Sequence, residues 1–213
     1  MTVEAEAGTA HDAGHSRRGP AGWDLSMHIL DLAQNSAKAG AARIEVRVDE
    51  DPECDALRVA VTDNGRGMDA STAARLMDPL VTARRARVAG HGLPLLHQAA
   101  AAAGGSLRVT SAPGAGTRVE AVFGLGHVDR APLGDLEATV LVLFAAHPGV
   151  DLAWTHRRGP REYGLSSADL RAALDGASLA SPAGIALVRS AVRHGEASLA
   201  GPAEERSRTE DQS

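Results

Sequence analysis

The sequence predicts an α+β fold, and three local patterns lead to this assignment. Residues 25–39 repeat apolar side chains at helical spacing. Residues 42–49 alternate apolar and charged side chains, which is typical of a half-buried strand. Residues 107–111 and 117–123 are strand-like runs joined by a turn that contains proline and two glycines, which indicates a hairpin.

Glycine and proline set several element boundaries. Gly40 follows the first helix, at the position where a left-handed residue commonly ends a helix. Pro94 lies in the first turn of a further helix, where proline is tolerated, and Gly104 ends that helix. In chain order we expect a helix at 25–39, strands at 42–49 and 57–62, a short helix ending at 77, a helix at 93–103, strands at 107–111 and 117–123, a helix at 133–147, strands at 150–156 and 162–165, and helices at 167–174 and 182–194.

Composition divides the chain and excludes some classes of protein. The 213 residues are 44% apolar but only 2% aromatic, so aliphatic side chains must form the core. The net charge of −5 argues against nucleic-acid binding, which relies on Lys and Arg. The single cysteine cannot form an intramolecular disulfide, and no apolar run is long enough to span a membrane. Because a signal-peptide core is also missing, we expect a cytoplasmic protein without a membrane partner.

Four segments are expected. They are a disordered N-terminal segment at 1–22, the main folded domain at 23–126, a small α/β extension at 127–197, and a disordered tail at 198–213.

The first helix places three polar groups on one stripe. Asp31, Asn35 and Lys38 follow one another at spacings of four and three residues. A carboxylate, an amide and an ammonium group therefore line up, which on its own is also typical of a solvated helix face.

Glycine motifs follow this helix. Asp63 ends a strand and precedes Gly65 and Gly67, so a hydrogen-bond acceptor lies beside backbone that a planar ligand can approach closely. A tight turn would explain the same residues. Residues 90–93, Gly-His-Gly-Leu, open a helix whose N–H groups could bind phosphate, or form a loop before a capped helix. Residues 114–117 lead into a strand and alone indicate only a hairpin.

In this order, the motifs resemble those of the GHKL superfamily of gyrase, heat-shock chaperone, histidine kinase and mismatch-repair ATPases. Residues 28–41 are similar to its N-box, 63–68 to its first glycine box, 78–82 to the segment entering the ATP lid, and 90–93 to its second glycine box. The resemblance covers residues 24–124. It implies a Bergerat-type two-layer α/β sandwich, in which helices cover one face of a mixed sheet, and an ATP-binding role for residues 23–126.

The resemblance also implies roles for individual residues. Asn35 would coordinate the Mg²⁺ that bridges the phosphates of ATP, and Lys38 would contact a phosphate. Asp63 would accept a hydrogen bond from the adenine amino group, and Thr117 would reach Asp63 or adenine. The other expected nucleotide contacts are Gly65, Gly67, Met68, Thr82, Gly90, His91, Gly92 and Leu93.

Asp31 departs from the pattern of the superfamily. Members that hydrolyse ATP carry Glu four residues before the N-box Asn, where it acts as a general base, and histidine kinases often carry Asn. Asp31 is therefore the candidate catalytic base, with a shorter side chain that leaves ATP hydrolysis open.

Other nucleotide and metal sites fit the sequence less well. Residues 65–70 match a dinucleotide-binding Gly-x-Gly-x-x-Ala pattern, but no strand with a terminal acid follows at the required distance. A P-loop, a zinc-binding cluster and a serine-hydrolase elbow are missing from the sequence.

Within the ATP-binding interpretation, residues 78–82 and 90–96 resemble the histidine-kinase and anti-sigma serine-kinase branch more than gyrase, so the favoured function is phosphate transfer in signalling. The acceptor is expected on a separate protein, because only about 24 residues precede the fold and His11 and His15 lie in no helical pattern. The alternatives are an ATP-gated binding module with slow or no hydrolysis, and an ATPase that uses Asp31 as its base. The extension is expected to contact a protein partner or a second copy of the chain.

Overall fold

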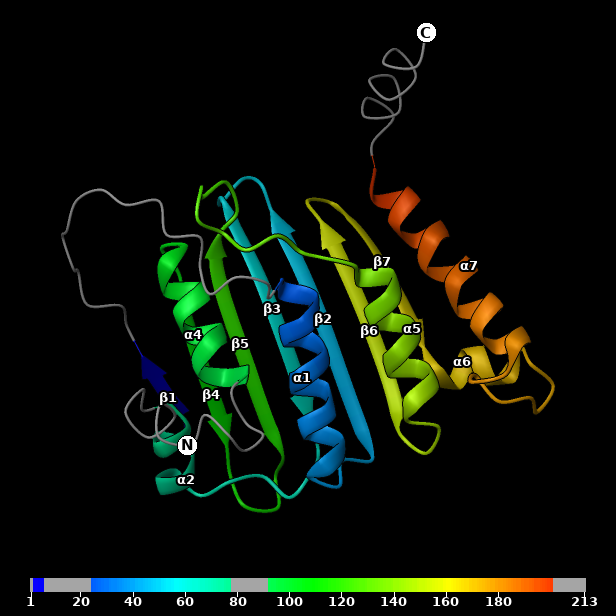
Figure 1. The fold of residues 1–213 in the computed structure, drawn as a ribbon, viewed down its shortest axis with the longest axis horizontal. Coiled ribbons are helices and arrows are strands. Elements are labelled where there is room, and N and C mark those ends of the chain that lie inside the picture. Colours follow the sequence, from blue (N-terminus) through cyan, green and yellow to red (C-terminus); the bar gives the residue numbers. More distant parts are fainter. Residues whose placement is uncertain (1, 6–23, 78–91, 201–213) are drawn as a thin grey trace, which may run out of the picture.

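The computed structural model describes residues 2–5, 24–77 and 92–200, which form the helices and strands labelled in Figure 1. In chain order these are β1 (Thr2–Ala5), α1 (Leu25–Lys38), β2 (Arg43–Asp51), β3 (Ala56–Asp63), α2 (Ala70–Met77), α4 (Gly92–Ala102), β4 (Ser106–Ser111), β5 (Thr117–Gly124), α5 (Leu136–Ala146), β6 (Asp151–Arg158), β7 (Arg161–Ser166), α6 (Ser167–Ala172) and α7 (Pro182–Leu199).

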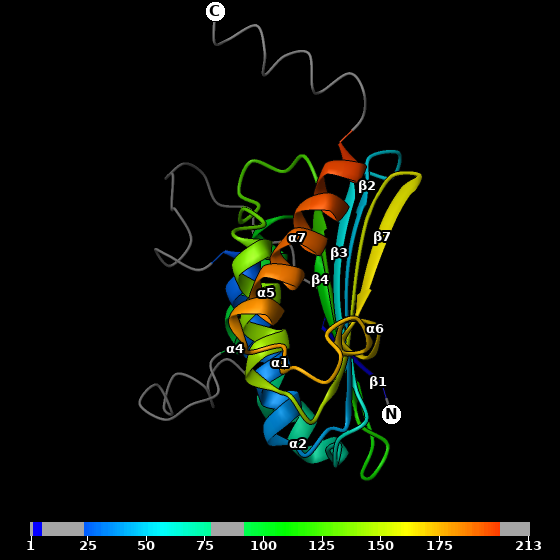
Figure 2. The ribbon, with the colours of Figure 1, turned by 90° about the vertical axis from the view of Figure 1, so that its right-hand side faces the viewer.

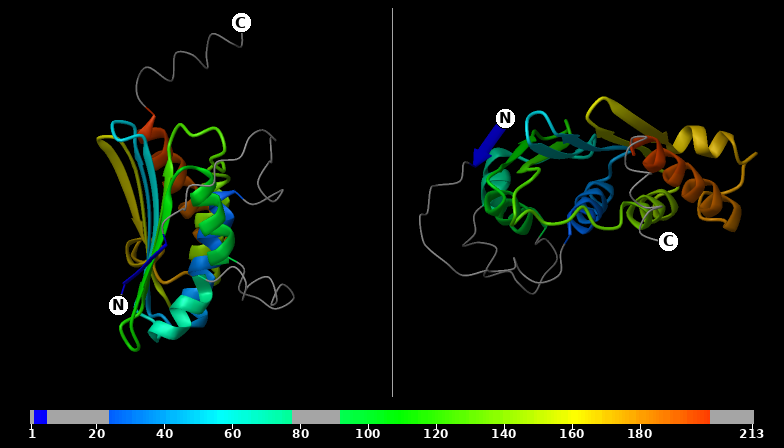
Figure 3. Two further views of the ribbon diagram at one scale, coloured as in Figure 1. Left: turned by 90° about the vertical axis from the view of Figure 1, so that its left-hand side faces the viewer. Right: turned by 90° about the horizontal axis from the view of Figure 1, so that it is seen from above.

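The strands form one mixed sheet with helices on one face. Its seven strands are arranged in the order β1-β4-β5-β3-β2-β6-β7. Among the described strands, β2 and β6 are parallel and all other neighbours are antiparallel. Helices α4, α1, α5 and α7 lie side by side over the same face, as the side and top views show (Figures 2 and 3). The predicted two-layer α/β sandwich with a mixed sheet is confirmed.

Strand β2 illustrates why the sheet has one apolar face. Its side chains alternate, so that Ile44, Val46 and Val48 are buried toward the helices while Arg43, Glu45 and Arg47 are exposed. Apolar residues of α1 at helical spacing, among them Leu25 and Ile29, complete this core from above.

The C-terminal extension continues the same sheet. Strand β6 pairs with β2 in a register that places Trp154 beside Val46, and Trp154 is almost fully buried. Helix α5 packs between α1 and α7. The residues from 127 onward therefore share one sheet and one core with the residues before them.

Most predicted boundaries agree with the observed ones to within about three residues, and the two larger differences lie at the N-terminus and in α7. Residues 2–5, which we expected to be disordered, pair with β4 from Thr2 opposite Thr110 to Ala5 opposite Leu107. Helix α7 continues to Leu199, beyond the predicted end at residue 194, and includes Gly195. A Cβ on Gly195 would lie 2.3 Å from the Tyr163 ring, so this glycine permits close packing inside the helix. None of the helices in the described part of the chain combines the length and apolarity needed to cross a bilayer.

A buried polar cluster fastens α7 to the sheet. The imidazole of His156 is 1% exposed, with Nε2 3.0 Å from Glu50 Oε1 and Nδ1 2.8 Å from Glu196 Oε1. Glu196 also accepts a hydrogen bond of 2.6 Å from the Tyr163 hydroxyl, and Glu50 accepts one from Arg158. Because both ring nitrogens face carboxylate oxygens, both donate only in the protonated imidazolium.

The pKa values of the cluster agree with this arrangement. Burial lowers the pKa of His156, but its hydrogen bonds to Glu196 and Glu50 outweigh burial, so the pKa is raised above its ordinary value. Burial raises the pKa values of Glu50 and Glu196, and their hydrogen bonds to His156 bring both below the ordinary value. The cluster is therefore held together by a cation between two anions.

Replacing His156 should weaken the fold in a pH-dependent way. His156→Ala leaves Glu50 and Glu196 without their shared cation, so we expect a loss of about 3 kcal/mol in the free energy of unfolding at neutral pH. Because the pKa of His156 is raised, its contribution in the wild type is complete below the unfolded-state pKa and is lost as the pH rises through the folded-state value. The carboxylate contributions are present above their unfolded-state pKa values and are lost as the pH falls through the folded-state values.

Urea unfolding across the pH range measures this effect, with the exposed His194→Ala on α7 as the matched control. If His156→Ala and the wild type lost stability in parallel on the alkaline side, the assignment of a protonated His156 would be wrong.

Candidate functional site

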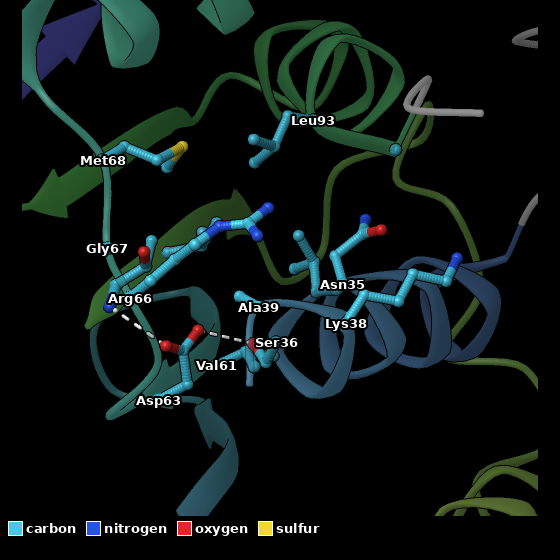
Figure 4. A pocket seen from close by; sticks show the side chains of 14 residues that line it. Asn35, Ser36, Lys38, Ala39, Val61, Asp63, Arg66, Gly67, Met68 and Leu93 are labelled. Atoms are coloured by element: carbon cyan, nitrogen blue, oxygen red, sulfur yellow. Dashed lines mark hydrogen bonds between the residues drawn. The ribbon is translucent and has the colours of Figure 1, made fainter. Parts of the chain in front are cut away.

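A pocket of about 350 Å³ lies between α1, the start of α4 and the ends of strands β3 and β5 (Figure 4). Its lining residues come from four separate stretches of the chain. They are Leu32, Asn35, Ser36, Lys38, Ala39, Val61, Asp63, Arg66, Gly67, Met68, Gly92, Leu93, Thr117 and Val119.

One carboxylate organises the end of this pocket at which strand β3 ends. Asp63 Oδ2 accepts a hydrogen bond of 2.6 Å from the Ser36 hydroxyl of α1. Asp63 Oδ1 accepts from the backbone N–H of Gly65 at 2.8 Å and from that of Thr117 at 3.2 Å. The side chain that ends β3 is therefore fixed by a helix, by the following turn and by the neighbouring strand, and it offers acceptor oxygen to the pocket.

A second hydroxyl lies behind this carboxylate. Ser111, at the end of β4, is buried, and its Oγ lies 2.9 Å from each of three groups. These are the backbone N–H of Met68, the carbonyl oxygen of Gly116 and the hydroxyl of Thr117. Ser111 therefore joins the glycine-rich turn that carries Met68 to the β4–β5 hairpin.

The opposite end of the pocket is formed by α1 and the beginning of α4. Asn35 Nδ2 donates a hydrogen bond of 3.1 Å to Asp31 Oδ2. A Cβ on Gly92 would lie 1.8 Å from that same oxygen, so the absence of a side chain at Gly92 lets Asp31 reach the start of α4. Lys38 extends along α1 away from Asp63 (Figure 4). A carboxylate, an amide and a cation thus lie together, and the amide oxygen of Asn35 is not the atom that contacts Asp31.

Apolar side chains line the space between the two ends. Val61 and Val119 are buried on adjacent strands. Met68 and Leu93 point toward each other across the pocket, and the Arg66 side chain reaches between them and Asn35 (Figure 4). An apolar slot with an acceptor at one end and cationic and amide groups at the other fits a flat ring that carries an amino group and a chain of negative charge.

The structure brings most of the predicted site residues together. Eight of them line the pocket, namely Asn35, Lys38, Asp63, Gly67, Met68, Gly92, Leu93 and Thr117. Gly65 donates its backbone N–H to Asp63, and Asp31 accepts a hydrogen bond from the pocket residue Asn35. Thr82, Gly90 and His91 lie outside the described residues.

Sequence reasoning missed Ser36, Arg66 and Ser111. Ser36 and Arg66 lie inside motifs that were recognised, and this position was the signal by which they could have been found. Ser111 ends a predicted strand and carried no signal of its own.

Comparison with known proteins decides the family. Residues 24–127 match the family described as histidine kinase-, DNA gyrase B- and HSP90-like ATPases. These residues belong to the GHKL superfamily. The sensor protein kinase FleS of Pseudomonas aeruginosa is 34% identical over 109 residues, which cover 51% of this chain and 26% of that kinase. The chain therefore spans about a quarter of the kinase's length.

Among solved structures, the ATPase domain of Aquifex aeolicus MutL complexed with ADP is similar with a TM-score of 0.40 and 16% identity, covering 66% of this chain and 62% of that one. The sequence matches, taken together, make residues 24–127 a GHKL ATP-binding domain of the histidine-kinase type. Residues 128–200 of the same sheet and helical layer lie outside the match to the family.

Proposed function

We propose that this chain binds MgATP in the pocket ending at Asp63 and transfers the γ-phosphate to a separate protein in signalling. The observation that carries the proposal is the Asp63 carboxylate, which three donors hold at one end of an apolar slot. The similarity of 109 residues of this chain to a sensor protein kinase supports phosphate transfer as the outcome of binding.

The geometry supports one orientation of the nucleotide. The adenine amino group lies at Asp63, whose carboxylate the Gly65 N–H holds, with the ring between the apolar walls and beside Gly67 and Met68. The triphosphate then extends toward Asn35, Lys38 and the start of α4, where Gly92 and Leu93 lie.

The residues of α1 fit a magnesium ion that enters with the nucleotide. No group of three or more His, Cys, Asp or Glu side chains that could hold a metal occurs within residues 2–5, 24–77 and 92–200. Magnesium commonly uses few protein ligands together with phosphate oxygens, and the Asn35 amide oxygen is a ligand of the right kind. When bound, the ion would neutralise charge on the phosphates.

Two other functions use the same pocket. Asp31 lies beside Asn35 and against Gly92, close to where the phosphates would end, which favours an ATPase with Asp31 as the base. An ATP-gated binding module needs only the binding step. In each case we propose that the extension, which shares its sheet with the ATP-binding domain, contacts the protein partner or a second copy of the chain.

Asp63→Asn should weaken ATP binding by about tenfold or more, which corresponds to about 1–3 kcal/mol. Asparagine can keep the bonds from Gly65 and Thr117 through its carbonyl oxygen, but its amide N–H groups then face the adenine amine. Titration calorimetry with MgATP measures the loss, and Asp175→Asn, the same change at an exposed position, is the control. Unchanged affinity in Asp63→Asn would remove Asp63 from the adenine site.

Asn35→Ala should weaken MgATP binding much more than the binding of ATP in the presence of a chelator. The reason is that the Asn35 amide would contact the ion and not the base. Calorimetry with and without magnesium measures the difference, and the adjacent Gln34→Ala serves as control. Equal weakening under both conditions would deny Asn35 a metal role.

The fate of the γ-phosphate should separate the three functions. Wild-type protein, γ-labelled ATP and a protein extract of the encoding organism are expected to yield a labelled protein, and Asn35→Ala should abolish the label. Phosphate release by the chain alone that disappears in Asp31→Asn would identify an ATPase instead. Tight MgATP binding with neither product would identify a binding module.

A further inference from the structure

The Ser111 hydroxyl makes as many hydrogen bonds as its chemistry allows. A hydroxyl has one hydrogen to donate and two lone pairs to accept. The backbone N–H of Met68 can only donate to Ser111, and the carbonyl of Gly116 can only accept from it. The Ser111 hydrogen therefore goes to Gly116, and the Thr117 hydroxyl donates to the remaining lone pair of Ser111. This is the one assignment of hydrogens in which all three contacts are hydrogen bonds.

The assignment fixes the polarity of Thr117 toward the pocket. Because the Thr117 hydrogen points to Ser111, its oxygen has only lone pairs to offer a ligand. The Ser36 hydrogen is likewise directed into the protein, at Asp63 Oδ2. The Asp63 end of the pocket thus presents acceptors from Asp63 and Thr117, while the hydroxyl hydrogens of Ser36, Ser111 and Thr117 are all directed to protein atoms.

We propose that Ser111 is a positioning residue that makes Thr117 a hydrogen-bond acceptor and so selects a 6-aminopurine over a 6-oxopurine nucleotide. Adenine carries an N–H₂ donor at position 6, whereas guanine and hypoxanthine carry an oxygen acceptor there. An acceptor facing an acceptor leaves both without a partner, and a site built this way rejects the wrong base strongly. The inference rests on the proposed function, because it assumes that the purine base lies at Asp63.

Inosine triphosphate is the matched probe, since its base differs from adenine only in carrying an oxygen at position 6 and a hydrogen on the adjacent N1. In Ser111→Ala the Thr117 hydroxyl loses its acceptor and can rotate to donate to the 6-oxygen. We expect the ratio of the dissociation constants of inosine triphosphate and ATP to fall by about tenfold, measured by calorimetry with magnesium. Thr117→Ser, which keeps the hydroxyl and its bond to Ser111, should retain the wild-type ratio.

A second pair of variants separates this role from simple loss of structure. Thr117→Val removes the acceptor oxygen, so it should also lower the ratio. Ser111→Ala added to Thr117→Val should then change the ratio no further, because no hydroxyl remains to be reoriented. Circular dichroism on each variant verifies that it is folded.

The outcomes are distinct. A lowered ratio in Ser111→Ala that depends on the Thr117 hydroxyl supports the proposal. Wild-type protein that prefers ATP, with Ser111→Ala weakening both nucleotides by the same factor, overturns the Ser111 role and leaves the proposed function in place. Wild-type protein that binds neither nucleotide overturns the proposed function, and this inference with it.

Discussion

The site depends on a carboxylate held at the end of a central strand. Asp63 lies opposite Thr117 in the β3–β5 ladder and opposite Ile44 in the β2–β3 ladder, so the sheet itself fixes its position. The Ser36 bond then ties α1 to that point. A half-buried carboxylate without these donors would be costly, so the same bonds that stabilise the fold also define the Asp63 end of the pocket.

Strand β2 connects this site to the C-terminal extension. Near its start Ile44 pairs with Asp63, and near its end Glu50 contacts His156 of β6. Because a paired strand is a rigid element, the end of the sheet that carries Asp63 and the polar cluster under α7 are fixed relative to one another. A contact made by α7 is therefore anchored to the strand that also pairs with Asp63 at the pocket.

Local patterns predicted most of the fold. Helical spacing in α1, alternation in β2 and turn chemistry between β4 and β5 each operate within a few residues, and the observed elements follow them closely. The exceptions depend on distant neighbours. The short strand β1 forms on the open edge of β4, and Gly195 meets a Tyr163 ring brought there by β7. In neither case can the contacting element, β4 for β1 and Tyr163 for Gly195, be predicted from the residues nearby in sequence.

The same limit applies to the site. Asn35, Asp63 and Gly92 were predicted because they belong to motifs whose order along the chain resembles that of a known superfamily, although each motif alone also fits an ordinary helix face, turn or loop. Ser111 accepts a hydrogen bond from Met68, which lies 43 residues away in sequence, and only the folded chain brings the two residues together. The hydrogen-bonding polarity of Thr117 follows from counting the donors and acceptors around Ser111, a count that requires coordinates.

The contact between Asp31 and Gly92 bears on how a nucleotide enters. A carboxylate at the beginning of α4 is favourable in the absence of other anions, because the N-terminal end of a helix attracts negative charge. A triphosphate bound there under the proposed function brings further negative charge next to Asp31, and like charges at short range repel. Asn35 donates to Asp31 and keeps its amide oxygen for a cation. A cation held there would relieve the repulsion between Asp31 and the phosphates. The arrangement on α1 therefore favours a nucleotide that arrives already paired with magnesium over the bare anion.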